Sequence, residues 1–186
     1  MPLARALLAQ ADEAAQEVRD TARGLRGALK IGVVGSAVYQ GLPALLQAFE
    51  AESPGVRCRT MELNSSDQVA AVASGQLDLG FVHTANLPAT LSRLQYAAQP
   101  FVCCLPQTHA AARKRRLAAA DLQQQPFIMF ARDASPDYYE RVLVVCTDAG
   151  FTPDIRHEAR HWLSVVSLVA QGLGVALVPE ALRTAS

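Results

Sequence analysis

Apolar segments of strand length alternate with amphipathic segments of helical spacing at the start of the chain. The segments of strand length cover residues 29–34, 56–63 and 77–82, of which the second has alternating character, and the amphipathic segments between them cover 41–51 and 66–74. Pro43 lies in the first turn of the first expected helix, and Gly75 follows the second, as is typical of helix ends. This order of strands and helices predicts a parallel sheet with right-handed connections and helices on its faces.

A second series of strands and helices follows. We expect strands at residues 94–105, 127–130, 154–158 and 175–178, and helices at 136–149 and 163–170. The sequence therefore predicts an α/β protein of two lobes, residues 28–87 and residues 88–186, joined near residues 86–92.

Residues 3–26 read as one long helix that precedes the two lobes. Apolar side chains recur every three or four residues along it, with charged residues between them. The resulting apolar stripe is narrow, which suits pairing with another helix. The same pattern also fits a helix that lies on its own domain, and the spacing alone does not decide between the two.

The composition excludes several classes of protein. The chain has 17 basic and 17 acidic side chains among 186 residues, so no excess of positive charge is available for an extended nucleic-acid-binding face. The four cysteines have no CxxC spacing, and we expect neither zinc nor another cofactor. No apolar run has the length of a membrane span. Residues 2–26 lack the pattern of a signal peptide, so with Met1 as the true start we expect a cytoplasmic protein that contacts no membrane.

Small polar residues follow the expected strands of the first lobe. Ser36 follows the first strand, Asn64, Ser65 and Ser66 follow the second, and His83 follows the third. Ligands of open α/β sheets bind beyond the carboxyl ends of the strands, and hydroxyl and amide groups at helix N-termini suit a small anion. Residues 131–138 form the corresponding group in the second lobe. The serines also fit a structural role as helix caps, and the two roles do not exclude each other.

The remaining motifs favour binding over catalysis. The sequence has no nucleophile elbow, GxGxxG, P-loop or HExxH motif. His157 and His161 have the spacing of a helical metal pair, but they fall at a strand and have no third ligand near them in sequence. The basic run at residues 113–116 fits a solvated turn or helix face, or else a nonspecific contact with DNA phosphates. Trp162, the single tryptophan, is expected in the core.

Five motifs occur in the order and spacing of one known family. They are Ile-Gly-Val-Val-Gly-Ser (31–36) with Leu-Pro-Ala-Leu-Leu (42–46), Phe49 with Ser-Pro-Gly-Val (53–56), Gly-Gln-Leu-Asp-Leu-Gly-Phe (75–81), Gly-Phe-Thr-Pro (150–153), and Leu-Val-Ala-Gln-Gly-Leu-Gly-Val-Ala-Leu-Val-Pro (168–179). From residue 29 to 182 the chain resembles the effector-binding domain of LysR-type transcriptional regulators.

The resemblance implies a two-lobed, periplasmic-binding-protein-like fold with a small inducer between the lobes. Residues 1–27 then contain the linker helix, which pairs subunits into a dimer or tetramer. By position Ser36 and Ser65 resemble the carboxylate-binding hydroxyls of the family, and His83 resembles a polar or basic residue found after the third strand. Pro136 and Tyr138 lie on the loop that closes over the effector. The motifs are most similar to those of regulators of aromatic-compound breakdown, which implies an aromatic or dicarboxylic acid such as benzoate or muconate.

Two features depart from the family pattern. No winged helix-turn-helix precedes residue 27, so we expect contact with DNA only through such a domain, which these residues do not contain. The residues also stop soon after Pro179, where members of the family return to the first lobe with further strands and a helix. Two alternatives remain, namely a solute-binding protein that delivers a small anion to a transporter, and a transferase or lyase on the same scaffold. The second needs an acid, base or nucleophile in the cleft, and none is evident, so we expect no enzyme activity.

Overall fold

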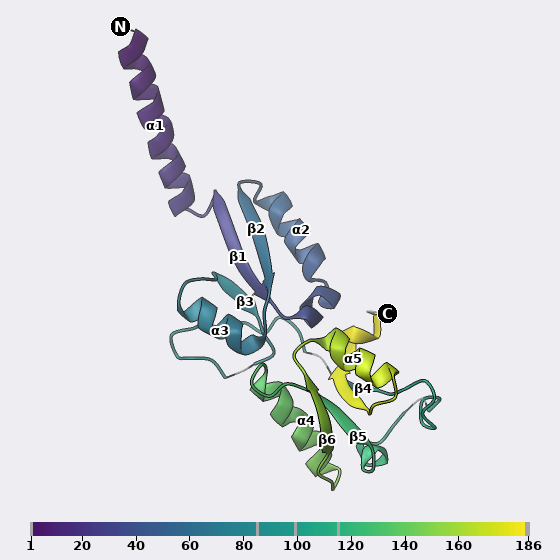
Figure 1. Ribbon diagram of the computed structural model, residues 1–186. Helices are drawn as coiled ribbons and strands as arrows, with labels where there is room; N and C mark the ends of the chain where they lie inside the picture. Colours follow the sequence, from purple (N-terminus) through teal and green to yellow (C-terminus); the bar gives the residue numbers. More distant parts are fainter. Residues whose placement is uncertain (1, 85, 99, 115, 185–186) are drawn as a thin grey trace.

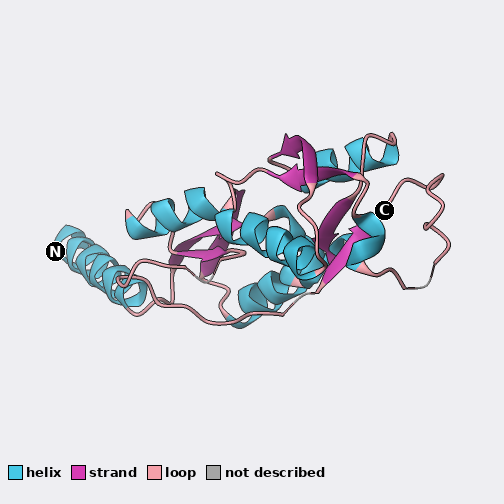
Figure 2. Ribbon diagram, turned by 90° about the horizontal axis from the view of Figure 1, so that it is seen from below, coloured by secondary structure: helices cyan, strands magenta, loops and turns pink. Residues whose placement is uncertain are grey.

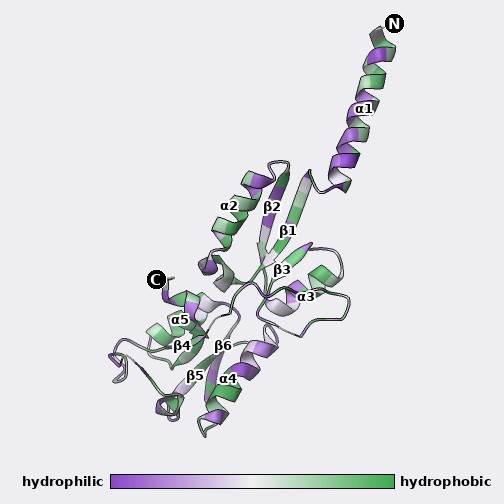
Figure 3. Cartoon of the chain, turned by 180° about the vertical axis from the view of Figure 1, so that it is seen from behind, coloured by the Kyte–Doolittle hydropathy of each residue, from purple (hydrophilic) through white to green (hydrophobic). Residues whose placement is uncertain are grey.

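The computed structural model describes residues 2–184 except 85, 99 and 115. Helix α1 (Pro2–Ala22) extends away from the rest of the protein as a single rod (Figures 1 and 2). It is expected at residues 3–26, but the last four of these residues form a turn and a bend that lead into the first strand. Hydrophobic and hydrophilic stretches alternate along α1 (Figure 3), and its large apolar side chains are exposed, including Leu3, Leu7, Leu8 and Val18.

The first lobe is a parallel three-stranded sheet with helices on its faces. Its strands are β1 (Gly27–Val33), β2 (Val56–Glu62) and β3 (Leu79–Phe81), in the order β2-β1-β3. The connecting helices are α2 (Leu42–Glu52) and α3 (Ser65–Ala73), and a 3-10 helix, η1 (Gly35–Gln40), precedes α2. Gly41 joins η1 to α2 with a φ of 86°, a left-handed conformation that favours glycine.

The close packing of α3 on this sheet explains two glycines of the first lobe. Gly32 and Gly80 are register partners on β1 and β3. A Cβ at either position would lie within 2.8 Å of the Gln68 side chain. Gln68 is fully buried, and its Nε2 donates to the Leu63 carbonyl at 2.7 Å. The glycines therefore make room for a buried amide that binds α3 to the end of β2.

The second lobe has two pairs of strands that a single bridge connects. Strand β5 (Pro126–Phe130) pairs in parallel with β6 (Asp154–Ala159), and β4 (Phe101–Cys104) pairs antiparallel with β7 (Ala176–Pro179). A parallel bridge between Phe127 and Val175 joins the two pairs. Helices α4 (Pro136–Asp148) and α5 (Trp162–Ala170) pack on these strands, together with the 3-10 helix η2 (Ala119–Leu122). Most of the buried apolar residues form one core here.

The lobes are connected by residues 82–100 and by a contact at the end of the chain. The 3-10 helix η3 (Glu180–Thr184) follows β7 of the second lobe and contacts η1 of the first. Each lobe has its own hydrophobic cluster. The domain boundaries expected after residues 27 and 87, which divide the linker helix, the first lobe and the second lobe, remain a prediction.

The element order agrees with the sequence analysis, with one difference. The stretch at residues 94–105 forms a strand only at β4, after Pro100. The pairing of β4 with β7 sets this length, because only Phe101 to Cys104 have partners on the other strand.

Candidate functional site

A cavity of about 210 Å³ lies between the two lobes, at the carboxyl ends of β1, β2, β5 and β6. The first lobe contributes Val34, Gly35, Glu62, Leu63, Asn64, Ser65, Asp67 and His83. The second contributes Phe130, Ser135, Arg160, His161 and Trp162. This is the position at which open α/β sheets bind ligands.

Ser36, Ser65 and His83 form one hydrogen-bonded group at the wall of the first lobe. Ser36 Oγ lies 2.5 Å from His83 Nε2, and the His83 backbone N–H donates to Ser65 Oγ at 3.0 Å. Ser36 is fully buried behind His83 and does not line the cavity itself. Both hydroxyls contact His83 and neither caps a helix, because the caps of η1 and α3 are Val34 and Asn64.

The surroundings of His83 favour its neutral imidazole. Burial, followed by the positive charge of Arg141, lowers the pKa of His83 below its ordinary value, since both disfavour the protonated ring. A neutral ring at the wall of the cavity offers hydrogen bonds rather than positive charge.

Three helices begin at this cavity. The residues just before α3, α4 and α5 are Asn64, Ser135 and His161, and all three line it. None of their side chains makes the usual cap hydrogen bond. The N-terminal end of a helix has free N–H groups and a partial positive charge, so three such ends favour an anion at this point.

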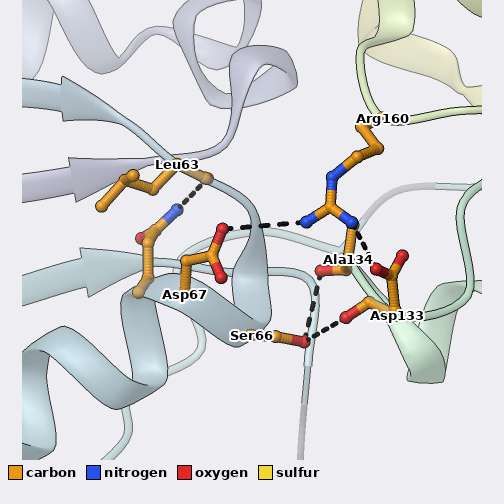
Figure 4. Close-up of polar contacts among 7 residues, drawn as sticks. Leu63, Ser66, Asp67, Asp133, Ala134 and Arg160 are labelled. Atoms are coloured by element: carbon orange, nitrogen blue, oxygen red, sulfur yellow. Dashed lines mark hydrogen bonds and ion pairs between the residues drawn. The ribbon is translucent and has the colours of Figure 1, made fainter.

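Arg160 is the only arginine or lysine that lines the cavity within the described part of the chain. Its guanidinium lies between two carboxylates, Asp133 of the same lobe and Asp67 of the other (Figure 4). The distance from Arg160 Nη2 to Asp67 Oδ2 is 4.0 Å. Glu62 adds a further carboxylate to the lining. A bound anion therefore has to compete with acidic side chains for Arg160.

Ser66 contacts the second lobe beside this ion pair. Its Oγ lies 3.0 Å from the Asp133 carbonyl, to which it donates, and 3.4 Å from the Ala134 carbonyl (Figure 4). Its backbone N–H donates to the Ala134 carbonyl at 3.3 Å. The loop before α4 is thus bound directly to the first turn of α3, and Ser66 lies at the contact between the lobes.

An aromatic wall closes the cavity on the side of the second lobe. The rings of Phe130 and Trp162 have centroids 4.6 Å apart and planes inclined at 35°. Trp162 therefore serves both the core, as expected, and the cavity lining. Such a wall suits a flat or apolar body that bears a polar group.

Like Ser36 and Ser66, the predicted site residues Pro136 and Tyr138 do not line this cavity. Both belong to helix α4 and not to a loop. Pro136 is exposed at the start of α4. Tyr138 is buried in the second core, where its hydroxyl donates to the Leu177 carbonyl and burial raises its pKa. Tyr138 also borders a second, wider hollow of about 1180 Å³ between the lobes, which Pro136 does not line.

The sequence analysis missed Ser135 as a named site residue, and also Arg160 and His161. The last two directly follow β6, so the rule that selected residues after the other strands would have found them. In the basic run, Arg113, Lys114 and Arg116 are exposed as expected, and residue 115 lies outside the described residues.

The described residues show neither a metal centre nor a membrane span. They contain no group of three or more histidine, cysteine, aspartate or glutamate side chains placed to hold a metal ion. None of the helices within them has the length and hydropathy needed to cross a bilayer.

Comparison with known proteins decides the family. The family profile described as LysR substrate binding domain matches residues 22–185. The chain belongs to this family. AlsR of Bacillus subtilis (strain 168), an HTH-type transcriptional regulator, is 32% identical over 179 residues, which cover 96% of this chain and 59% of AlsR. The chain thus spans about three fifths of the length of this relative.

Two solved structures share the fold. The BenM effector binding domain with its effector benzoate matches with a TM-score of 0.73 at 22% identity, covering 84% of this chain and 71% of that one. Full-length CbnR complexed with its target DNA matches with a TM-score of 0.75 at 21% identity, covering 96% of this chain and 60% of CbnR. The predicted family and the predicted two-lobed α/β fold are confirmed.

Proposed function

We propose that this chain is the effector-sensing part of a LysR-type regulator and binds a small aromatic or dicarboxylic acid between its lobes. The observation that supports this proposal best is the meeting of three helix N-termini at one cavity, each without a side-chain cap hydrogen bond. Hydroxyl, amide and N–H groups at helix N-termini bind carboxylates well.

The charges of the site narrow the choice of ligand. Glu62 and Asp67 disfavour an anion, whereas Arg160 and the three helix ends favour one. The Phe130–Trp162 wall suits an aromatic ring. BenM, which shares the fold, has benzoate as its effector. Together these features favour a carboxylate on a flat body, with Arg160 as its main counter-ion.

Three compounds with one ring and different charge test this proposal. Benzoate, benzamide and benzylamine present an anion, a neutral amide and a cation on the same aromatic ring. In isothermal titration we expect benzoate to bind at least about tenfold more tightly than the other two, which is a difference of about 1.4 kcal/mol. A straight-chain dicarboxylate such as muconate extends the series. Equal or tighter binding of benzylamine would contradict an anion site.

The proposal extends to subunits and to DNA. The exposed apolar stripe of α1 fits pairing with the same helix of a second copy, in a dimer or tetramer. DNA binding is proposed only for a longer protein with a helix-turn-helix domain, since AlsR is an HTH-type regulator and CbnR was solved with its target DNA. A regulator that acts on DNA works in the cytoplasm, where we locate this one. AlsR and CbnR are transcriptional regulators, which favours neither a solute-binding protein of a transporter nor an enzyme.

A further inference from the structure

Ser135 occupies the N-cap of α4 but does not cap that helix. A serine at this position ordinarily accepts a hydrogen bond from an N–H group of the first turn, and this bond stabilises the helix. Ser135 makes no such bond, and its φ and ψ are −152° and 79°. The usual structural reason for a serine at a helix start therefore does not apply here.

The hydroxyl of Ser135 is also buried without a partner. Ser135 is 3% exposed, and its Oγ has no hydrogen-bond partner among the residues that the structure describes. Native proteins pair nearly all their buried polar side chains, because a buried polar group without a partner is destabilising. Since Ser135 lines the cavity between the lobes, its unpaired hydroxyl indicates a role in binding.

The serines of the first lobe differ from Ser135 in this respect. Ser36 Oγ bonds to the His83 ring, so Ser36 positions His83. Ser65 Oγ accepts the His83 N–H and keeps its own O–H for donation. Two serines from different lobes, Ser65 and Ser135, thus line one cavity, and neither donates its O–H within the described residues.

We infer that Ser135 is a ligand-contacting residue, whose Oγ–H donates a hydrogen bond to an oxygen of the bound acid. The inference rests on the proposed function, since it assigns a second-lobe contact for the same ligand. A ligand oxygen held by Ser135 and Ser65 together connects the lobes. Binding then favours one relative position of the lobes over others.

Thermal unfolding of the chain without ligand tests whether the unpaired hydroxyl of Ser135 contributes to stability. Ser135→Ala removes a group without a partner, so we expect a Tm equal to or above that of the parent. Ser36→Ala breaks the bond to the half-buried ring of His83, and we expect its Tm to fall by about 3 °C or more. Ser164→Ala on α5 is the control, because Ser164 is exposed and lines neither hollow. If Ser135→Ala lowers the Tm as Ser36→Ala does, Ser135 has a structural role and the inference is overturned.

Benzoate titration of the same variants tests the contact. We expect Ser135→Ala to weaken benzoate binding at least about tenfold, as for a lost hydrogen bond to a charged group, and Ser164→Ala to bind like the parent. Unchanged affinity in Ser135→Ala would overturn the inference and leave the proposed function intact. If the parent itself binds no benzoate, benzoate is excluded as the ligand of the proposed function, and the thermal comparison alone decides the role of Ser135.

Discussion

Replacing Arg160 with glutamine separates two roles of its charge, ligand binding and lobe contact. The side chains of Arg160, Asp67 and Asp133 are 45%, 53% and 72% exposed. Ion pairs as exposed as these contribute about 0–1 kcal/mol, because water screens them. A hydrogen bond from a guanidinium to a ligand carboxylate contributes about 1.5–3 kcal/mol. We therefore expect Arg160→Gln to lower the free energy of unfolding by less than about 1 kcal/mol, yet to weaken benzoate binding about tenfold to a hundredfold.

Urea unfolding and isothermal titration measure the two effects on the same samples. Arg156→Gln is the matched control, because Arg156 lies on β6, which ends just before Arg160, pairs with Asp154 at 2.8 Å and does not line the cavity. We expect this control to bind benzoate like the parent. Benzoate binding by the parent should also weaken as ionic strength rises. Undiminished binding in Arg160→Gln would refute the assignment of Arg160 as the counter-ion of the ligand.

Three further predictions concern pH, packing and assembly. Because burial lowers the pKa of His83, the stability that its neutral ring provides is complete above the unfolded pKa of about 6.5 and declines as the pH falls below it. In urea unfolding, the free energy of unfolding should fall more between pH 7.5 and pH 5.5 for the parent and for His157→Gln than for His83→Gln. An equal fall in all three proteins would contradict this prediction. Gly32→Ala places a Cβ 2.8 Å from Gln68 Cγ and should destabilise the protein by about 1–3 kcal/mol, whereas an unchanged urea midpoint would show that this packing is loose. Leu7→Glu should convert a dimer to a monomer in light scattering, and an unchanged mass would exclude the α1 stripe as the interface.

The order of strands and helices could be predicted because its signals are local. Residues 56–63 and 66–74 were expected as a strand and a helix, and they appear as β2 and α3 with ends shifted by one residue. The strand predicted at residues 94–105 was too long, because the extent of β4 depends on its pairing with β7, which lies more than 70 residues further along the chain. Strand pairing of this kind leaves little trace in the local pattern of either segment.

The site was partly predictable for a similar reason. The carboxyl ends of parallel strands meet at one edge of the sheet, and this rule led to Ser36, Ser65 and His83, which the structure brings together. Applied to β6, the same rule leads to Arg160. The unused hydroxyl of Ser135 could not be predicted, because an N-cap serine gives no sign in sequence of whether its Oγ is bonded.

The central claim is that a small anion binds where α3, α4 and α5 begin. Titration of the ¹⁵N-labelled chain with benzoate, followed by amide chemical shifts, tests it most directly. The account predicts that the amides of Ser65, Asp137 and Trp162, in the first turns of these helices, shift together with one dissociation constant while those of α1 stay fixed. Shifts confined to one lobe, or identical shifts with benzamide, would contradict it.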